Sequence, residues 1–600
     1  MTATAQAPTR TRARGPVSPQ TLSGEPPRRR VSAERIAGWV VIVALIAFSV
    51  YSLSQMGLDA QYIATASQKV HSFFGSTTNA ISFPPFADLI YLTGLTLGVV
   101  ILGTVIAALI SIPVAYIAAA NTAPTPWLHW LGRAIGVLTR AVPDVVIAFS
   151  LSLMFALGST IPGIIAIGIH SIGMISKLFA DAIEQVDEGP RLAIRAAGGS
   201  KAQEFWAGVF PQVLPSWIAT ALHRFDINLR GSAILGYAGV GGLGYAMMLA
   251  FNQFNYGRGL GIAFVIFLLC IVLEIVSSTI RRTLLGIEPA GNSIGDRLVR
   301  VAGRRRARAA ARGAGSVPAA GSLPATATGT PGRLAPLTVE AAMRRPWSRE
   351  RVRDTSWGII AVAVVLASIW LAQVDPRQIM WKYVWPGIRS FWPPNLGSVG
   401  ASGLLAATMS TLEIAFAAAI ISLVFALVIG SFAARNIAPN GIVRSVFRVI
   451  LTILRGIPEL IVALFLIVIA GLGAVPALVA LALGGVGLLG KLIADSFEEV
   501  PRGPETALSA AGATRGQRFA SATLPQGLPS LIGNSLYLVD SNFRSAVLLG
   551  VVGAGGIGYY LALSAPQLNQ HGMVTALVGV MIVVVLIIEG IAAWLRRVFK

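Results

Sequence analysis

The sequence predicts an all-α polytopic membrane protein built from two homologous six-helix halves. Composition is the first observation: 54% of the residues are hydrophobic and only 12% are charged, whereas about a quarter are charged in soluble domains. Apolar runs of the ~20 residues needed to cross a hydrocarbon core are the second observation, and they recur along the whole chain. The third is an internal repeat that covers much of each half.

Hydropathy predicts six helices in each half, or about 12 transmembrane helices in all. The expected helices are 36–54, 88–119, 133–157, 160–185, 212–235 and 258–280 in the first half, and 355–373, 402–434, 447–470, 475–498, 527–550 and 573–596 in the second. An even number of crossings in each half makes the two repeats parallel rather than inverted.

The repeat is strongest over the fourth and fifth helices. A shift of 314 residues aligns Lys177–Tyr245 with Lys491–Tyr559 without a gap, at roughly 30 identities in 69 positions. Upstream, RAVPD at 140–144 aligns with RGIPE at 455–459 at a shift of 315. The chain therefore contains two copies of one unit.

The expected division of the chain is a basic tail at 1–35, a first half at 36–285, a basic linker at 286–354 and a second half at 355–600. The tail, the linker and the C-terminal RRVFK are rich in Lys and Arg, while 55–87 carries one Lys and no Arg, so both termini and the linker are expected in the cytosol. We interpret the tail as uncleaved and the linker as a flexible tether. The net charge of +21 could also suggest a nucleic-acid partner, but in a membrane protein basic residues mark the cytosolic side.

Two cytosolic loops, 186–211 and 500–526, follow the fourth helices. Each opens with Gly-Pro, which suits the start of a short separate helix, and AIRAAGGSKAQEFWAGVFP in the first matches ALSAAGATRGQRFASATLP in the second. On composition alone, each could be an ordinary interfacial helix.

Polar residues interrupt the fifth helices in two related stretches. These read LHRFDINLRGSAILGYAGVGGLGY at 222–245 and LYLVDSNFRSAVLLGVVGAGGIGY at 536–559. Ionisable groups inside a span cost ~2.5–3.5 kcal/mol on insertion scales and normally face the bundle interior or a water path. Because Asp and Arg stand four apart in both stretches, they could form a self-neutralising pair that holds the packing, or they could line a path.

Two further patterns limit the chemistry. GVGLLGK at 485–491 has the spacing of a P-loop, but Leu492 replaces the Ser or Thr and no strand precedes it, so we predict no ATP site in this chain. Cys270 is the only cysteine, and the five scattered histidines have no metal-ligand spacing, so neither a disulfide nor a metal is expected.

The cytosolic loops resemble the coupling loop of ABC-importer permeases, in which a Gly is followed at a fixed interval by Leu-Pro. Here Gly198 precedes Phe210-Pro211 and Gly512 precedes Leu524-Pro525, although Leu192 and Thr506 replace the Glu that begins the family motif. The stretches RFDINLRGSAILGYAGVGGLG and VDSNFRSAVLLGVVGAGGIG, with RAVPD and RGIPE, are similar to those of phosphonate/phosphate-type importer permeases.

This resemblance implies the methionine-importer-like permease fold in a bacterial cell membrane and an import function without enzymatic activity in this chain. It implies a cytosolic ABC ATPase dimer that binds ATP and Mg, and an extracytoplasmic substrate-binding protein, with no cofactor in the permease itself. The cargo would be phosphate, phosphonate or phosphite. An importer for an amino acid or a compatible solute has the same fold and remains open, as does a secondary transporter that needs no ATPase.

Three groups of site residues are expected. The substrate path would be lined by Arg224, Asp226, Asn228, Arg230, Asp540, Asn542 and Arg544, with Arg140 and Arg455 at the start of the third helices. The resemblance assigns ATPase coupling to Ala193, Ala197, Gly198, Pro211, Ala507, Ala511, Gly512 and Pro525. Glycines that break the helix on the external side, for gating or packing rather than for anion binding, are Gly241, Gly242, Gly244, Gly555, Gly556 and Gly558.

The two copies of the polar stretch are not identical. Both share Asp, Asn and Arg, but Leu538 occupies the position that corresponds to Arg224. A guanidinium group binds phosphate oxygens with two parallel hydrogen bonds. The two sides of the expected path are therefore predicted to be chemically unequal.

Overall fold

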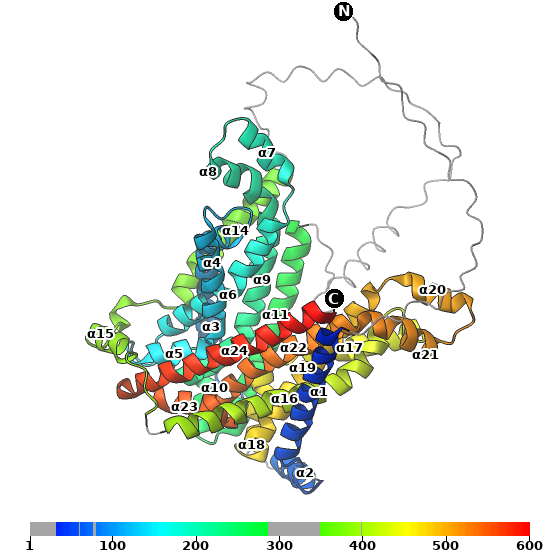
Figure 1. Ribbon diagram of the computed structural model, residues 1–600. Coiled ribbons are helices and arrows are strands. Elements are labelled where there is room, and N and C mark those ends of the chain that lie inside the picture. The colour runs from blue at the N-terminus through cyan, green and yellow to red at the C-terminus, as the bar shows by residue number, and fades with distance from the viewer. Residues whose placement is uncertain (1–31, 59, 76–79, 286–348, 398, 600) are drawn as a thin grey trace, which may run out of the picture.

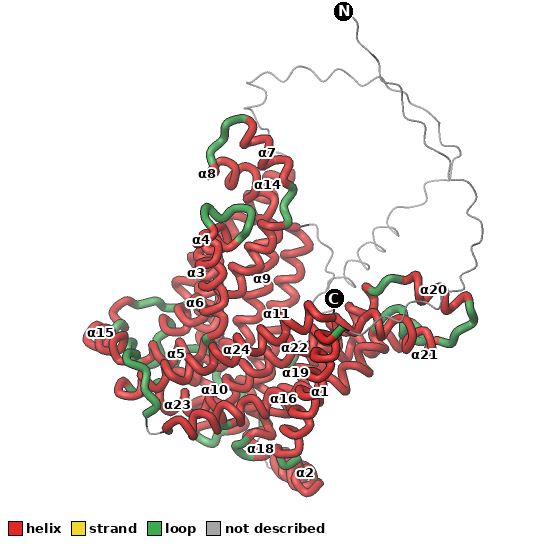
Figure 2. The backbone as a smooth tube through the Cα atoms, viewed as in Figure 1, coloured by secondary structure: helices red, strands yellow, loops and turns green. Residues whose placement is uncertain are grey.

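The computed structural model describes residues 32–58, 60–75, 80–285, 349–397 and 399–599. Most of the predicted basic tail and the predicted linker up to residue 348 lie outside the described residues. Within them every regular element is a helix and there is no strand, apart from a single bridge between Phe155 and Ile379, and loops join the helices (Figure 2).

The helices of the two halves follow one another in the same order (Figure 1). In the first half they are α1 (Ala33–Gln55), α2 (Ala60–Gly75), α3 (Phe86–Ala118), α4 (Pro126–Ala141), α5 (Asp144–Ser152), α6 (Ile161–Glu184), α7 (Glu188–Ala196), α8 (Lys201–Gln203), α9 (Phe210–Leu235), α10 (Leu243–Asn252) and α11 (Tyr256–Leu285). In the second half they are α14 (Arg349–Leu371), α15 (Trp381–Ser390), α16 (Gly400–Ala433), α17 (Gly441–Gly456), α18 (Glu459–Ala470), α19 (Ala474–Glu499), α20 (Arg502–Ala510), α21 (Arg515–Arg518), α22 (Leu524–Leu549), α23 (Gly556–Ser564) and α24 (His571–Phe599).

The apolar helices lie where hydropathy predicts them. Among the described residues, seven helices are long and apolar enough to span a membrane, and four further pairs of helices pass the same test with a bend between their members. With Thr355–Leu371, a shorter apolar helix, these segments coincide with the twelve predicted helices. The fifth predicted helix of each half is continuous, as α9 and α22.

The prediction of a single continuous third helix in each half is wrong. It is two helices, α4 and α5 in the first half and α17 and α18 in the second, which meet at 75° and 74°. Pro143 and Pro458 are responsible, because proline has no backbone N–H to donate and excludes helical geometry at the residue before it. Arg140 and Arg455 consequently lie at the ends of α4 and α17, not at the start of a helix.

The same contacts recur in both halves and explain several identities in the repeat. Glu184 accepts hydrogen bonds from the backbone of Ala120 and from Arg133, and its equivalent Glu498 accepts them from the backbone of Arg435 and from Arg448. These carboxylates tie the chain after α3 or α16 to the end of α6 or α19. The repeat therefore preserves packing contacts between its second, third and fourth membrane helices.

The first helix of each half packs on the other half. Helix α1 lies against α16 and α24, and α14 lies against α3 (Figure 1). Gly98 in α3 makes the second contact close, since a Cβ there would lie 2.7 Å from the Cα of Ala372, and Thr160 donates to the carbonyl of Ala372 at 2.6 Å. One hydrophobic core runs through both halves.

Candidate functional site between the two halves

The polar residues of α9 do not form the predicted pair within that helix. Asp226 lies 3.7 Å from Arg281 of α11, and Arg230 lies 3.7 Å from Glu274 of the same helix. Of the two alternatives left open by the sequence, the self-neutralising Asp–Arg pair therefore does not form in the first half. The reason is that α11 brings one cation and one carboxylate against α9, which offers each residue a partner on a neighbouring helix.

In α22 the predicted pair does form. Arg544 donates a hydrogen bond to Asp540 one turn earlier, and both side chains are largely buried. The two copies of the polar stretch thus use the same residue types in different pairings.

Three of the predicted path residues lie inside their own half. Arg224 is buried and donates to the hydroxyl of Ser171 at 3.0 Å, and the Asn228 amide donates to Thr104 and Ser171 at 2.9 and 3.0 Å. Asn542 donates to the carbonyl of Ala415 at 3.3 Å. These contacts hold α9 and α22 against neighbouring helices of the same half.

Arg140, Arg230 and Arg455 make contacts across the boundary between the halves. Arg140 of α4 donates a hydrogen bond to Glu589 of α24, and Arg230 of α9 donates to the backbone carbonyl of Arg455 at 3.0 Å. Each contact joins the first half to the second. Charged side chains from both halves therefore face one another within the membrane-spanning bundle.

Glu274 and Glu589 are functional candidates that the sequence reasoning missed. They occupy equivalent positions of α11 and α24, 315 residues apart, in otherwise apolar surroundings. Extending the self-comparison beyond residue 559 at that shift would have found them. Glu274 has Arg230 as its cationic neighbour, and Glu589 has Arg140.

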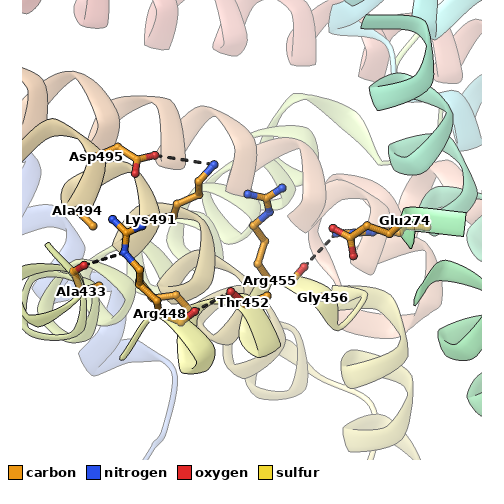
Figure 3. A pocket seen from close by; sticks show the side chains of 11 residues that line it. Glu274, Ala433, Arg448, Thr452, Arg455, Gly456, Lys491, Ala494 and Asp495 are labelled. Atoms are coloured by element: carbon orange, nitrogen blue, oxygen red, sulfur yellow. Dashed lines mark hydrogen bonds and ion pairs between the residues drawn. The ribbon is translucent and has the colours of Figure 1, made fainter. Parts of the chain in front are cut away.

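A narrow recess opens at this boundary. The space that it offers to the centre of a water-sized sphere is about 20 Å³, close to what one water molecule needs. Figure 3 shows the side chains of Arg455 and Lys491 directed into the same space. The charged and polar residues that line it are Arg230, Glu274, Arg448, Thr452, Arg455, Lys491 and Asp495.

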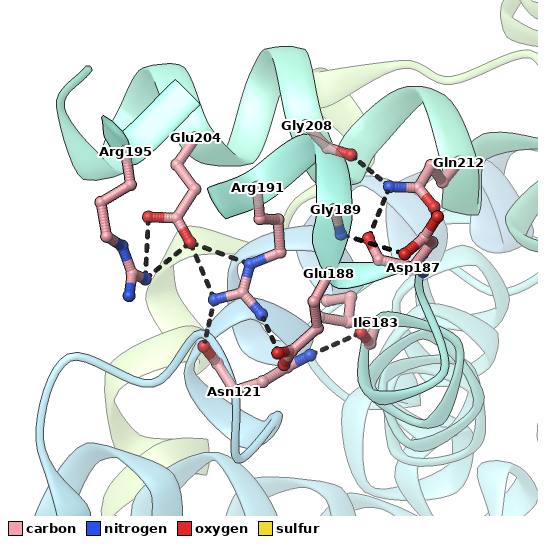
Figure 4. Close-up of polar contacts among 10 residues, drawn as sticks. All are labelled: Asn121, Ile183, Asp187, Glu188, Gly189, Arg191, Arg195, Glu204, Gly208 and Gln212. Atoms are coloured by element: carbon pink, nitrogen blue, oxygen red, sulfur yellow. Dashed lines mark hydrogen bonds and ion pairs between the residues drawn. The ribbon is translucent and has the colours of Figure 1, made fainter. Parts of the chain in front are cut away.

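The first predicted coupling loop is two short helices joined by a turn (Figure 4). Gly198 makes that turn, because it adopts φ +79°, a left-handed conformation that suits glycine. Gly199 then donates to the carbonyl of Ile194 at 2.9 Å, which closes the end of α7. Pro211 stands in the first turn of α9, directly after the π-helical turn Glu204–Val209.

A buried ion pair holds the first loop together. Arg191 lies 2.8 Å from Glu204 and also donates to the carbonyl of Asn121 at 2.9 Å, while Arg195 donates to Glu204 at 3.0 Å (Figure 4). Burial opposes ionisation of Glu204, but its hydrogen bonds with the two guanidinium groups outweigh that effect and lower its pKa below the ordinary value. The carboxylate therefore stays charged at neutral pH.

The second loop has the same shape with the charges exchanged. Gly512 adopts φ +79° between α20 and α21, and Pro525 begins α22. Glu505 stands at the position equivalent to Arg191 and accepts from Thr523 and from Asn436. Arg518 stands at the position equivalent to Glu204. The predicted coupling residues Ala193, Ala197, Ala507 and Ala511 lie on or at the ends of α7 and α20.

The predicted glycines lie where α9 and α22 end. The chain bends by 48° before α10 and by 62° before α23, and Gly242 (φ +136°), Gly555 (φ +90°) and Gly556 (φ +68°) adopt conformations that side chains disfavour. Gly244 packs so tightly that a Cβ would lie 2.5 Å from the carbonyl oxygen of Ala233.

Threonine hydroxyl groups accept hydrogen bonds from backbone N–H groups at these bends. The N–H of Leu243 donates to Thr96 and that of Ile557 to Thr411, both at 2.9 Å. The backbone at both bends is thus closely packed, and each of these two N–H groups has a hydrogen-bond acceptor within the protein. The stretch GVGLLGK at 485–491, which has the spacing of a P-loop, lies inside the continuous helix α19.

Comparison with known proteins gives matches to both halves. The family model described as "Binding-protein-dependent transport system inner membrane component" matches residues 111–284 and again residues 426–600. The "Phosphate-import permease protein PhnE" of Mycolicibacterium smegmatis is 35% identical over 505 residues, which cover 84% of each chain.

Shorter relatives match part of the chain. The "Phosphite transport system permease protein PtxC" of Stutzerimonas stutzeri is 37% identical over 31% of this chain and 68% of its own length. The "Probable D-methionine transport system permease protein MetI" of Haemophilus influenzae is 29% identical over 30% of this chain and 90% of its own length. The two matches of the family model agree with two homologous halves in one polypeptide.

Proposed function

Because the chain belongs to the family of binding-protein-dependent transport system inner membrane components, we propose that it is the permease subunit of an ABC importer for oxyanions of phosphorus. Two halves in one chain would form the whole translocation unit. The relatives named for phosphate and phosphite support this cargo. The relative named for methionine is less similar and supports the amino-acid alternative only weakly.

The observation that carries the proposal is the meeting of cations from both halves at their boundary. Arg230 from the first half reaches the backbone of Arg455 in the second, and the recess beside them is also lined by Arg448 and Lys491. Guanidinium groups suit phosphate and phosphonate oxygens, because their planar donors match the spacing of two acceptors. The cargo would pass between the halves with transient electrostatic guidance, since tight binding would oppose release.

Energy would come from a separate cytosolic ATPase dimer that binds ATP and Mg, with no ATP site in this chain. The paired coupling segments, α7–α8 and α20–α21, support this arrangement because each presents short helices at the end of its bundle. Movement of the ATPase subunits against them would switch the two bundles between inward- and outward-facing states.

The proposed orientation places both termini and the coupling segments in the cytosol. The basic C-terminal end of α24 supports it, because Arg596 and Arg597 stand in the last turn. A substrate-binding protein would deliver the cargo to the opposite face, near α2, α10, α15 and α23.

The test is uptake by the full chain reconstituted in vesicles with its ATPase and binding protein. We expect ATP-dependent uptake of inorganic phosphate, phosphite or methylphosphonate, with methionine and glycine betaine as controls. Uptake of methionine or betaine without any of the oxyanions would overturn the cargo assignment. Deleting 191–210 should abolish uptake in an ATPase-driven importer, and retention of uptake would instead indicate a secondary transporter.

A further inference from the structure

An apolar groove lies where the first helix of one half crosses the other half. Its walls come from α1 on one side and from α16 and α22 on the other, and Leu595 of α24 completes them. The groove offers about 240 Å³ to the centre of a water-sized sphere, whereas one water molecule needs about 10–15 Å³ on that measure. It is therefore large enough for a segment of an extended hydrocarbon chain.

The walls of the groove are almost free of polar groups. All of the residues that line it are apolar except Ser49 and Ser535. Each of these serines donates its hydroxyl to the carbonyl one turn earlier, that of Leu45 or Leu531, at 2.8 Å. Enclosed water needs two to four polar partners, and an empty groove forfeits dispersion contacts along its walls. A hydrocarbon chain is therefore the occupant that these walls favour.

The groove has the length of an acyl chain within one leaflet of a bilayer. On α1 its lining runs from Trp39 to Ser49, and on α22 from Leu528 to Val539. At 1.5 Å per residue these segments are about 15–17 Å long, which is half of the ~30 Å hydrocarbon core. A chain lying along the groove would thus reach from the membrane surface to the middle of the bilayer.

Cationic side chains stand at one end of the groove. Arg35 lies one turn before Trp39 on the same face of α1, and Arg596 lies in the last turn of α24, where both are exposed. The stem of Arg596 runs along α22, since a Cβ at Gly533 would lie 3.5 Å from its Cδ. The rings of Trp39 and Phe599 meet edge-on with centroids 5.3 Å apart, so the start of α1 and the end of α24 lie together.

The same end of the groove has the residues of a membrane surface. Trp39 is partly exposed there, and tryptophan is enriched at the level of lipid headgroups. Arginine near a helix end extends its charged group to that level. Anionic headgroups are attracted to such clusters of basic residues. The groove therefore combines an apolar channel for a chain with a positively charged opening for a headgroup.

We propose that this groove binds one acyl chain of an anionic phospholipid, with the headgroup among Arg35, Arg596 and Arg597. The lipid belongs to the leaflet that contains the start of α1 and the end of α24, which is the cytosolic leaflet in the proposed orientation. Because α1 comes from the first half and α16 and α22 from the second, the bound lipid helps to hold the two halves together. This site goes beyond the proposed function and does not depend on the cargo.

A photoreactive lipid tests the site directly. The full chain in phosphatidylcholine nanodiscs receives a trace of phosphatidylglycerol that carries a diazirine midway along one acyl chain, and mass spectrometry identifies the labelled peptides after illumination. Label should concentrate in 39–49 and 528–539. The matching phosphatidylcholine probe should label these segments about tenfold less, because its headgroup has no net charge to interact with the arginines.

Variants that fill the groove separate this site from general lipid contact. Ala419→Phe places a ring inside the groove and should lower labelling of 39–49 by the phosphatidylglycerol probe several-fold. Ala593→Phe adds the same bulk at an exposed position of α24 outside the groove lining and should leave the labelling unchanged. Ile420→Trp fills the same groove from the neighbouring position and replaces Ala419→Phe if that variant does not fold.

A charge variant tests the headgroup end. Arg35→Gln combined with Arg596→Gln should reduce labelling by the phosphatidylglycerol probe to nearly that of the phosphatidylcholine probe. Arg258→Gln combined with Arg502→Gln is the matched control, because it removes two exposed arginines that stand outside α1 and α24. This control should label like the wild-type chain.

Two results would overturn the lipid site. Label that is spread evenly over the membrane helices, or that is unchanged when the groove is filled, would show only general contact with bulk lipid. Equal labelling by the two probes would show that the arginines do not select an anionic headgroup. No transport is measured here, so a chain that imports no phosphorus oxyanion would reject the proposed function while the lipid site is judged by its labelling alone.

Discussion

Arg140 of the first half is hydrogen-bonded to Glu589 of the second, whereas both residues at the equivalent positions, Arg455 and Glu274, are in contact with Arg230. The repeat thus places an Arg and a Glu on each side of the boundary but does not arrange them alike. A symmetric dimer of one short chain has identical sequences on both sides, while a fused chain can change each copy separately.

The Arg140–Glu589 contact should stabilise the association of the halves. Either Arg140→Gln or Glu589→Gln leaves a partly buried charge without its partner, which we expect to cost about 1–3 kcal/mol. Thermal unfolding of the purified chain measures this. The double variant should lose less than the sum of the two single variants, because the remaining charge is then also removed. Strictly additive losses would show that the two residues do not interact.

Arg230 should resist replacement by lysine. Its guanidinium spans the carbonyl of Arg455 and the carboxylate of Glu274, on two different helices. Lysine carries the charge on a single nitrogen and cannot reproduce this fork. We therefore expect phosphate uptake to fall strongly in both Arg230→Gln and Arg230→Lys, at normal membrane levels. Recovery of uptake in Arg230→Lys would mean that charge alone is required.

The first coupling segment should depend on Arg191. The variant Arg191→Ala loses one of the two cationic partners of Glu204 and the contact with the carbonyl of Asn121, at a cost of about 1.5–3 kcal/mol for hydrogen bonds to charged groups. We expect faster proteolysis within 188–204 and weaker co-purification of the ATPase.

Arg502→Ala is the matched surface control for that experiment, because Arg502 is an exposed residue at the start of α20. It should leave proteolysis of 188–204 unchanged. Equal rates of proteolysis within 188–204 for Arg191→Ala and the wild-type chain would contradict the role of Arg191 in holding this loop together.

The bend after α9 should not tolerate a methyl group at Gly244. A Cβ there would lie 2.5 Å from the carbonyl oxygen of Ala233, and overpacking of this kind costs about 1–3 kcal/mol. Gly244→Ala should therefore lower the melting temperature. Gly579→Ala is the control, because it lies inside α24 with no atom near its added Cβ, and there alanine favours the helix by up to about 1 kcal/mol. Similar melting temperatures for both variants would contradict the close packing.

The sequence predicts the membrane helices, the repeat and the short helices of the two loops well, because hydropathy and self-alignment report on them directly. The bend at Pro143 and Pro458 was visible in the sequence as RAVPD and RGIPE, but hydropathy averaged over a window does not register it. The partners of Asp226 and Arg230 could not be predicted from spacing within α9, because α11 provides them. Pairing between helices depends on tertiary packing, and the spacing of residues along one helix does not report on it.

Because the first helix of each half packs on the other half, the order of synthesis decides when each helix meets its partner. Helix α1 emerges from the ribosome early, but α16, on which it packs, begins only at residue 400. At synthesis rates of about 5–20 residues per second, α1 waits roughly 20–70 s for that partner. Its exposed Val40, Val43 and Val50 can contact lipid throughout this interval. Ribosomes that stop within the linker would therefore release a half that lacks α14 and leaves α1 without its main contact.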